Sequence, residues 1–186
     1  RVTDKIIVKI LKAAPDVDND TITYRYQWTV NGKPVNFPPD ADVLVPGMIA
    51  KNHAFTVTVI PSDGDQDGTP VKAEGRAVNT PPEKPEVAVG PAKPTVLDGI
   101  AAGVKKESAD ADGDAVGYSF SWYRNGDLQQ GQKGAAVPGK DLKKGEAWKV
   151  VATPNDGEKD GVAGESSITV VNTAPPRIEA DLSTVE

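Results

Sequence analysis

The sequence contains no cysteine, only one histidine and one methionine, and few aromatic residues, with three Trp, four Tyr and three Phe among 186 residues. Without cysteine, the chain has no disulfide, no thiolate zinc site and no cysteine nucleophile. No uninterrupted apolar run approaches the roughly 20 residues that a membrane-spanning helix needs. The net charge of −6 argues against nucleic acid as a partner, because a phosphate backbone is bound by a basic face. We therefore expect no membrane insertion and no nucleic-acid binding.

An internal repeat is the strongest signal in the chain. Residues 16–32 match residues 110–126 at a spacing of 94, and seven positions are identical. The identical pairs are Asp16/Asp110, Asp18/Asp112, Asp20/Asp114, Tyr24/Tyr118, Trp28/Trp122, Asn31/Asn125 and Gly32/Gly126. The sequence Val-Asn-Thr at 78–80 recurs at 171–173, at a spacing of 93. The chain is thus predicted to hold two copies of one domain.

The register of the repeat predicts where each domain begins. Arg1 aligns with Thr95, so the first copy has no counterpart of the residues that open the second. The segment from Pro175 resembles the opening of another copy. We expect a first repeat at 1–80 without its first strand, a Pro-rich linker at 81–85, a second repeat at 86–173, and a linker with the first strand of a third repeat at 174–186.

Alternating apolar residues predict strands rather than helices. Tyr24, Tyr26 and Trp28 lie two residues apart, and the corresponding segment of the second repeat ends at Trp122 in the same pattern. This period of two is typical of a strand with one buried face. An Asn-Gly pair follows each of these strands and predicts a tight turn, since both residues accept a positive φ. We therefore expect an all-β chain.

These features together resemble the tandem immunoglobulin-like or cadherin-like repeats of bacterial cell-surface and secreted proteins. The resemblance covers both copies and implies two tandem immunoglobulin-like β-sandwiches of about seven strands each, each with a buried Trp on the third strand. It implies an extracellular or cell-surface location and a non-enzymatic structural or adhesive role. The chain lacks the paired cysteines of true immunoglobulin domains. In their places we expect apolar residues, namely Val8 or Ile10 with Val57, and Ala102 or Val104 with Val150.

Acidic residues gather in two loops of each repeat. In an immunoglobulin-like topology both loops emerge at the same end of the sandwich, and Ca²⁺ prefers six to eight hard oxygen ligands. The spacing therefore predicts calcium sites, although Ala115 and Ser121 depart from the EF-hand pattern. A bound ion beside the linker would stiffen the joint between repeats. The candidate metal ligands are Asp16, Asp18, Asp20, Asp63 and Asp67 in the first repeat, and Asp110, Asp112, Asp114, Asp156 and Asp160 in the second. The alternative is a metal-free turn in which Asp side chains accept hydrogen bonds from nearby backbone N–H groups.

Little in the sequence favours an enzyme. The sole histidine, His53, has no counterpart in the second repeat and no nucleophile motif beside it. The expected partners are neighbouring repeats or other copies of the chain. One alternative is a filament or pilus-like subunit that polymerises by β-strand exchange through its C-terminal strand. Another is a carbohydrate-binding module that presents Tyr123 and Phe37 to a cell-surface glycan.

Overall fold

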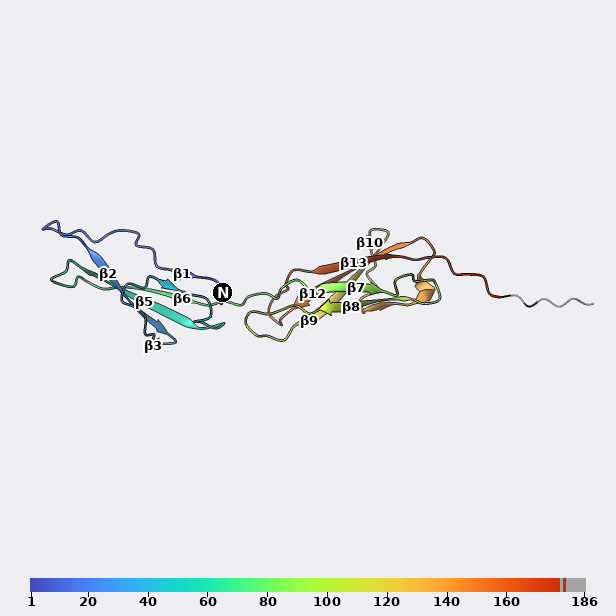
Figure 1. Cartoon of the computed structure of the whole chain (residues 1–186), viewed down its shortest axis with the longest axis horizontal. Coiled ribbons are helices and arrows are strands. Elements are labelled where there is room, and N and C mark those ends of the chain that lie inside the picture. Colours follow the sequence, from blue (N-terminus) through green and yellow to red (C-terminus); the bar gives the residue numbers. More distant parts are fainter. Residues whose placement is uncertain (178, 180–186) are drawn as a thin grey trace, which may run out of the picture. The chain divides into compact units, whose positions relative to one another are not determined.

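Strands make up both halves of the computed structural model, which describes residues 1–177 and 179 (Figure 1). Contacts between residues divide the chain into two compact units. The first contains residues 1–81 together with residues 110–114, and the second contains residues 82–109 together with the residues from Ala115 onward. The one helical element in the described residues is a three-residue 3-10 turn, η1 (Gly139–Asp141). No helix among them is long and apolar enough to cross a membrane. The prediction of an all-β chain is confirmed.

The first unit is built from six strands in two antiparallel sheets. One sheet pairs β1 (Ile6–Ile7) with β4 (Val43–Leu44). The strands of the other lie in the order β3-β2-β5-β6. Their bounds are β2 (Thr23–Val30), β3 (Lys33–Pro34), β5 (Ala54–Ser62) and β6 (Val71–Arg76).

The second unit repeats this arrangement with one more strand, which gives the seven that the sequence predicts. Its smaller sheet has the order β11-β8-β7 and its larger sheet the order β10-β9-β12-β13. The smaller sheet contains β7 (Glu86–Gly90), β8 (Ile100–Lys106) and β11 (Ala136–Val137). The larger contains β9 (Gly117–Arg124), β10 (Asp127–Leu128), β12 (Ala147–Asn155) and β13 (Gly164–Thr169). Every strand of the first unit has a counterpart here, and β7 is the additional one.

A buried tryptophan lies at the centre of each core. Trp28 is 2% exposed and Trp122 is fully buried. Each faces a buried valine on the neighbouring strand, since Trp28 pairs with Val57 and Trp122 with Val150. These valines are among the residues predicted in place of the disulfide, and each lies beside the indole in the same sheet and in the same core.

The Asn-Gly turns adopt the conformation that their sequence predicts. Asn31 and Asn125 have φ values of 49° and 50°, in the left-handed region. Each side chain also bridges two strands of the larger sheet. The Oδ1 atom of Asn31 accepts a hydrogen bond from Ala54 N at 3.0 Å, and that of Asn125 accepts one from Ala147 N at 2.9 Å.

Replacing Asn125 by Ala should lower the stability of the second unit by about 1–2 kcal/mol, because the variant loses the hydrogen bond and places a Cβ-bearing residue without a polar side chain at a positive φ. Asn125→Gly should lose less, since Gly accepts the backbone conformation. Urea denaturation of both variants measures the difference. Equal losses would contradict a role for the left-handed conformation.

Candidate metal centre in the acidic loops

The first acidic loop of each repeat is held by its leading aspartate. Asp110 Oδ1 accepts hydrogen bonds from the backbone N–H groups of Asp112 and Asp114, at 2.9 and 3.1 Å. In the first repeat, Asp16 Oδ1 accepts the equivalent pair from residues 18 and 20, both at 2.9 Å. A residue of positive φ, Gly113 or Asn19, turns each loop. One oxygen of the leading carboxylate therefore fixes the backbone, as the metal-free alternative requires.

The second acidic loop, which follows β5 or β12, is closed in the same way. Asp63 Oδ1 accepts hydrogen bonds from Asp65 N at 2.8 Å and Gln66 N at 2.7 Å. Asp156 Oδ1 accepts two at 2.7 Å from Glu158 N and Lys159 N. The backbone N–H groups of Gln66 and then Asp65 hold the pKa of the Asp63 carboxyl below its usual value. The Asp63 side chain is therefore a carboxylate at neutral pH.

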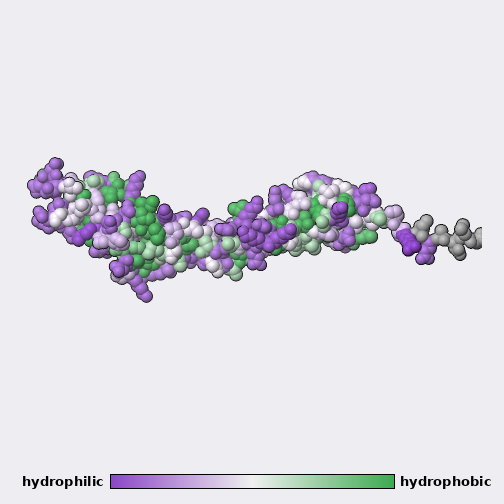
Figure 2. All heavy atoms as spheres, viewed as in Figure 1, coloured by the Kyte–Doolittle hydropathy of each residue, from purple (hydrophilic) through white to green (hydrophobic). Residues whose placement is uncertain are grey.

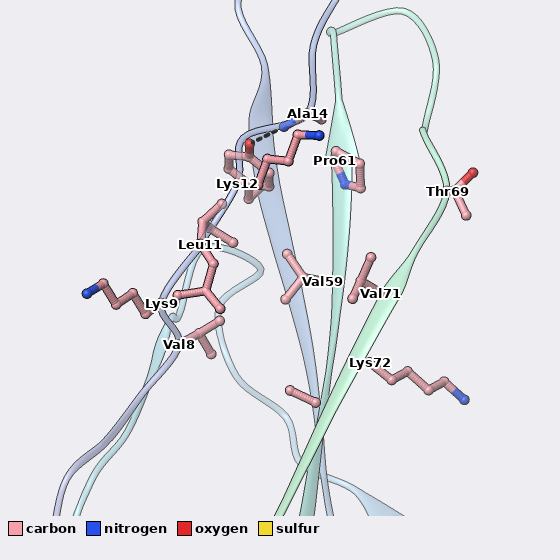
Figure 3. Close-up of a pocket in the computed structure, with 13 residues that line it drawn as sticks. Val8, Lys9, Leu11, Lys12, Ala14, Val59, Pro61, Thr69, Val71 and Lys72 are labelled. Atoms are coloured by element: carbon pink, nitrogen blue, oxygen red, sulfur yellow. Dashed lines mark hydrogen bonds between the residues drawn. The ribbon is translucent and has the colours of Figure 1, made fainter.

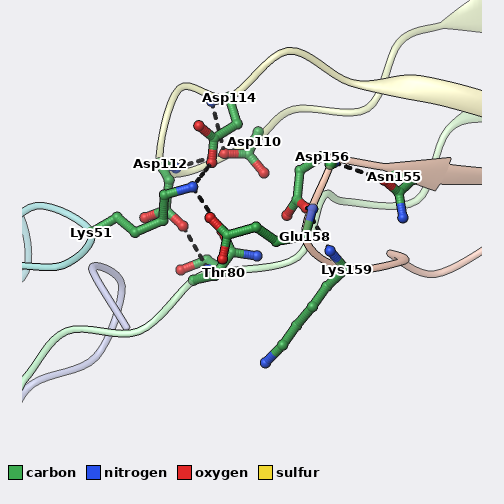
Figure 4. A network of polar contacts seen from close by, with 11 residues as sticks. Lys51, Thr80, Asp110, Asp112, Asp114, Asn155, Asp156, Glu158 and Lys159 are labelled. Carbon is green, nitrogen blue, oxygen red and sulfur yellow. Dashed lines mark hydrogen bonds and ion pairs between the residues drawn. The ribbon is translucent and has the colours of Figure 1, made fainter.

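In the second repeat the two loops bring three carboxylates together (Figure 4). Strands β9 and β12 are paired up to Gly117 and Asn155, so the loops at their ends lie side by side. Carboxylate oxygens of Asp110, Asp114 and Asp156 all lie within 4.8 Å of one another. Asp110 Oδ2 and Asp112 Oδ1 are buried and have no hydrogen-bond donor within the described residues. This set of hard oxygen donors suits a divalent cation such as Ca²⁺.

A lysine from the first repeat also contacts this loop. Lys51 Nζ forms an ion pair with the Asp114 carboxylate and donates a hydrogen bond to Asn79 Oδ1 at 3.2 Å. Thr80 N donates to Asp112 Oδ2 at 2.6 Å. The sequence reasoning missed Lys51. No pattern in the sequence links Lys51 to Asp114, which lies 63 residues away along the chain.

Several of the predicted ligands have other partners. The Asp67 carboxylate pairs with Arg25, and Asp160 Oδ1 accepts a hydrogen bond from Asn155 Nδ2 at 2.7 Å. Asp18 and Asp20 are exposed. The second repeat thus supplies the one close group of three carboxylates found in the described residues. For the ligands of the first repeat, calcium binding stays a prediction.

The residues considered for catalysis or glycan binding make contacts within the fold. His53 Nδ1 accepts a hydrogen bond from Ala50 N at 3.1 Å, in the turn before β5. Phe37 packs against the first core. The Lys149 ammonium lies over the Tyr123 ring, 5.0 Å from its centroid. These contacts account for His53 and Phe37 without catalysis or glycan binding, and they cover one face of Tyr123.

Comparisons with known proteins identify no family for this chain. No protein-family model matches the sequence, and a search of the curated proteins found no match. Among solved structures, a two-domain fibronectin type III segment of chicken tenascin is 11% identical, with a TM-score of 0.41 over 83% of this chain and 87% of that one. The FN1–FN3 domains of chicken CNTN1 are 12% identical, with a TM-score of 0.43 over 86% of this chain and 61% of that one. The fibronectin(III)-like modules of Clostridium thermocellum CbhA are 12% identical, with a TM-score of 0.31 over 85% and 83%.

Proposed function

We propose that the chain is a non-enzymatic spacer from an extracellular or cell-surface tandem-repeat protein, and that it serves a structural or adhesive role. The sequence repeat carries this proposal, because the two copies share the same strand order in their larger sheets and a buried Trp in each core. We take 1–80 and 86–173 as the two domains, joined by a linker at 81–85. A repeated sandwich that carries the same loops twice suits a protein that spans distance.

Calcium bound at Asp110, Asp112, Asp114 and Asp156 would stiffen this spacer. Three observations support the ion: the close carboxylates, the two buried oxygens that lack a donor, and the contact of Thr80 with the loop. Thr80 directly precedes the proline pair that opens the linker. A cation bound to the loop would therefore restrict the movement of Thr80, which lies beside the linker. The Lys51 ammonium now supplies part of the neutralising charge, and it would compete with the ion for Asp114.

Thermal melting in EDTA and in millimolar calcium tests the site. A ligand at about 100 times its dissociation constant adds about 2.7 kcal/mol, which raises the Tm of a domain of this size by about 10 °C or more. Asp110→Asn should abolish the shift. Asp16→Asn is the matched control, because Asp16 accepts the same two backbone hydrogen bonds but lies outside the group of three carboxylates.

Lys51→Met sharpens the test. The variant should melt lower than the wild type in EDTA, because the carboxylates lose a neutralising charge, and it should bind calcium more tightly. Isothermal titration with calcium measures the affinity directly. If the wild type has the same Tm in EDTA and in calcium, the loops are metal-free turns. Calcium then contributes nothing to the stiffness of the spacer.

A further inference from the structure

The turn before β5 in the first unit is closed by a histidine side chain. His53 N donates a hydrogen bond to Ala50 O at 3.0 Å, and Ala50 N donates one to His53 Nδ1 at 3.1 Å. The two bonds enclose Lys51 and Asn52, and Asn52 has a φ of 67°. The imidazole of His53 thus supplies one of the two acceptors that close the turn at 50–53.

The second unit closes its equivalent turn with a carboxylate. Glu146 N donates a hydrogen bond to Lys143 O at 3.2 Å, and Lys143 N donates one to Glu146 Oε2 at 2.9 Å. Each turn is also bonded to the residue that directly follows the last strand of its larger sheet. Ala77 N donates to His53 O, and Val170 N donates to Glu146 O. The two copies therefore use an imidazole and a carboxylate at the same structural position.

These two acceptors respond differently to acid. A neutral imidazole accepts a hydrogen bond at one ring nitrogen, whereas a protonated imidazole carries N–H groups on both nitrogens and accepts none. Histidine is the side chain whose charge ordinarily changes between about pH 5 and pH 8, and a glutamate side chain ordinarily stays ionised there. Protonation of His53 would therefore set two N–H groups against each other, one at Nδ1 and one at Ala50.

We infer that His53 is a pH-sensitive switch, which keeps the 50–53 turn closed at neutral pH and opens it in weak acid. Lys51 lies inside this turn, so the conformation of the turn sets where its side chain begins. Lys51 Nζ donates a hydrogen bond to Asn79 Oδ1 at 3.2 Å and pairs with the Asp114 carboxylate (Figure 4). Opening the turn would weaken both contacts. The inference goes beyond the proposed spacer function and needs no bound cation.

The charged groups around His53 come from four segments. His53 directly precedes β5 and lies on the same face as Phe55, since side chains two residues apart along a strand point the same way. Phe55 pairs with Val30 of β2 and Gly75 of β6, neither of which is charged. The charged residues of the surrounding segments, as far as the structure describes them, are Lys51 in the turn, Arg76 at the end of β6, Asp112 and Asp114 in the loop that Lys51 contacts, and Arg1 and Asp4 in the N-terminal segment. The tests below change none of these except Lys51, so a response that is lost with His53 belongs to its imidazole.

The apolar surface of the first unit is separate from this turn. Apolar residues reach the surface of the unit in the space-filling view (Figure 2). A groove of about 450 Å³ lies between residues 8–14 and strands β5 and β6, and Lys72 is at its rim (Figure 3). No residue of the 50–53 turn lines it. Strand exchange through the predicted C-terminal strand stays a prediction, because residues 180–186 lie outside the described residues.

Hydrogen exchange of the full chain, followed by NMR, tests the switch at single amides. Between about pH 7.5 and pH 5.5 the protection factor of the Ala50 amide should fall about fivefold after correction for intrinsic exchange, because one hydrogen bond is worth about that factor. The Lys143 amide is the internal control, since a carboxylate accepts its hydrogen bond. His53→Glu gives the first unit the acceptor of the second and should remove the fall. His53→Gln, whose side-chain carbonyl also accepts a hydrogen bond, replaces it if the Glu variant does not fold.

Thermal melting in EDTA tests the consequence for Lys51. Lys51→Met should lower the Tm of the first unit by more at about pH 7.5 than at about pH 5.5, where the wild-type turn is already open. In the His53→Glu background, Lys51→Met should have the same effect at both pH values. Lys72→Met is the matched control, because Lys72 lies on β6 beside the groove and its effect should not depend on residue 53.

Two results would overturn the switch itself. One is an Ala50 protection factor that stays constant while the ring resonances of His53 report protonation, or a ring that stays neutral down to about pH 5. The other is a fall in protection that persists in His53→Glu. An effect of Lys51→Met that is equal at both pH values in the wild type would overturn the link from His53 to Lys51.

Discussion

Replacing Trp122 by Ala should destabilise the second unit by about 3–5 kcal/mol, enough to lower its Tm by more than about 10 °C. The indole is fully buried and meets Trp148 edge to face, with the ring centroids 6.3 Å apart. Its Nε1 donates a hydrogen bond to Gly134 O at 2.9 Å. The substitution therefore leaves a cavity in the core and removes the donor from a loop carbonyl.

Tyr123→Ala is the matched control for this loss. Tyr123 follows Trp122 on β9 and points to the other side of the sheet, where its ring contacts Lys149. We expect a loss of about 1 kcal/mol or less, since a partly exposed cation–π contact is worth roughly that amount. Thermal melting followed by circular dichroism compares the two variants. Equal losses would mean that the core does not depend on the Trp122 face of the strand.

Replacing Gly139 by Ala should destabilise the second unit by about 1–3 kcal/mol. Gly139 opens η1, and a Cβ there would lie 2.3 Å from Val96 O and 3.1 Å from Val96 C. Both atoms belong to the backbone, so no side-chain rotation relieves the clash. Either the 3-10 turn or the segment that carries Val96, just before β8, has to move.

Gly134→Ala is the control for the general effect of losing a glycine. A Cβ at Gly134 would have no atom within 4 Å, and its φ is not positive. Its stability should stay within about 0.5 kcal/mol of the wild type. Urea denaturation curves of the two variants give the comparison. If both variants unfold at the same urea concentration, the approach of Gly139 to Val96 does not constrain the fold.

The sequence by itself determined most of the fold. Apolar residues at every second position around Trp28 and Trp122 specify strands with one buried face, and the structure places both indoles in cores. The Asn-Gly pairs specify the turns that follow, because few other residues tolerate a positive φ. These features are local, so a single sequence reveals them. The repeat then shows which segments of the two copies correspond.

Only the tertiary structure decided which polar side chains meet. Ten aspartates were candidate ligands on equal terms, yet Asp110, Asp114 and Asp156 form the close group, while Asp67 pairs with Arg25. Lys51 reaches Asp114 from 63 residues away along the chain. Such contacts depend on loop conformation and strand pairing between distant segments, which local residue patterns do not encode.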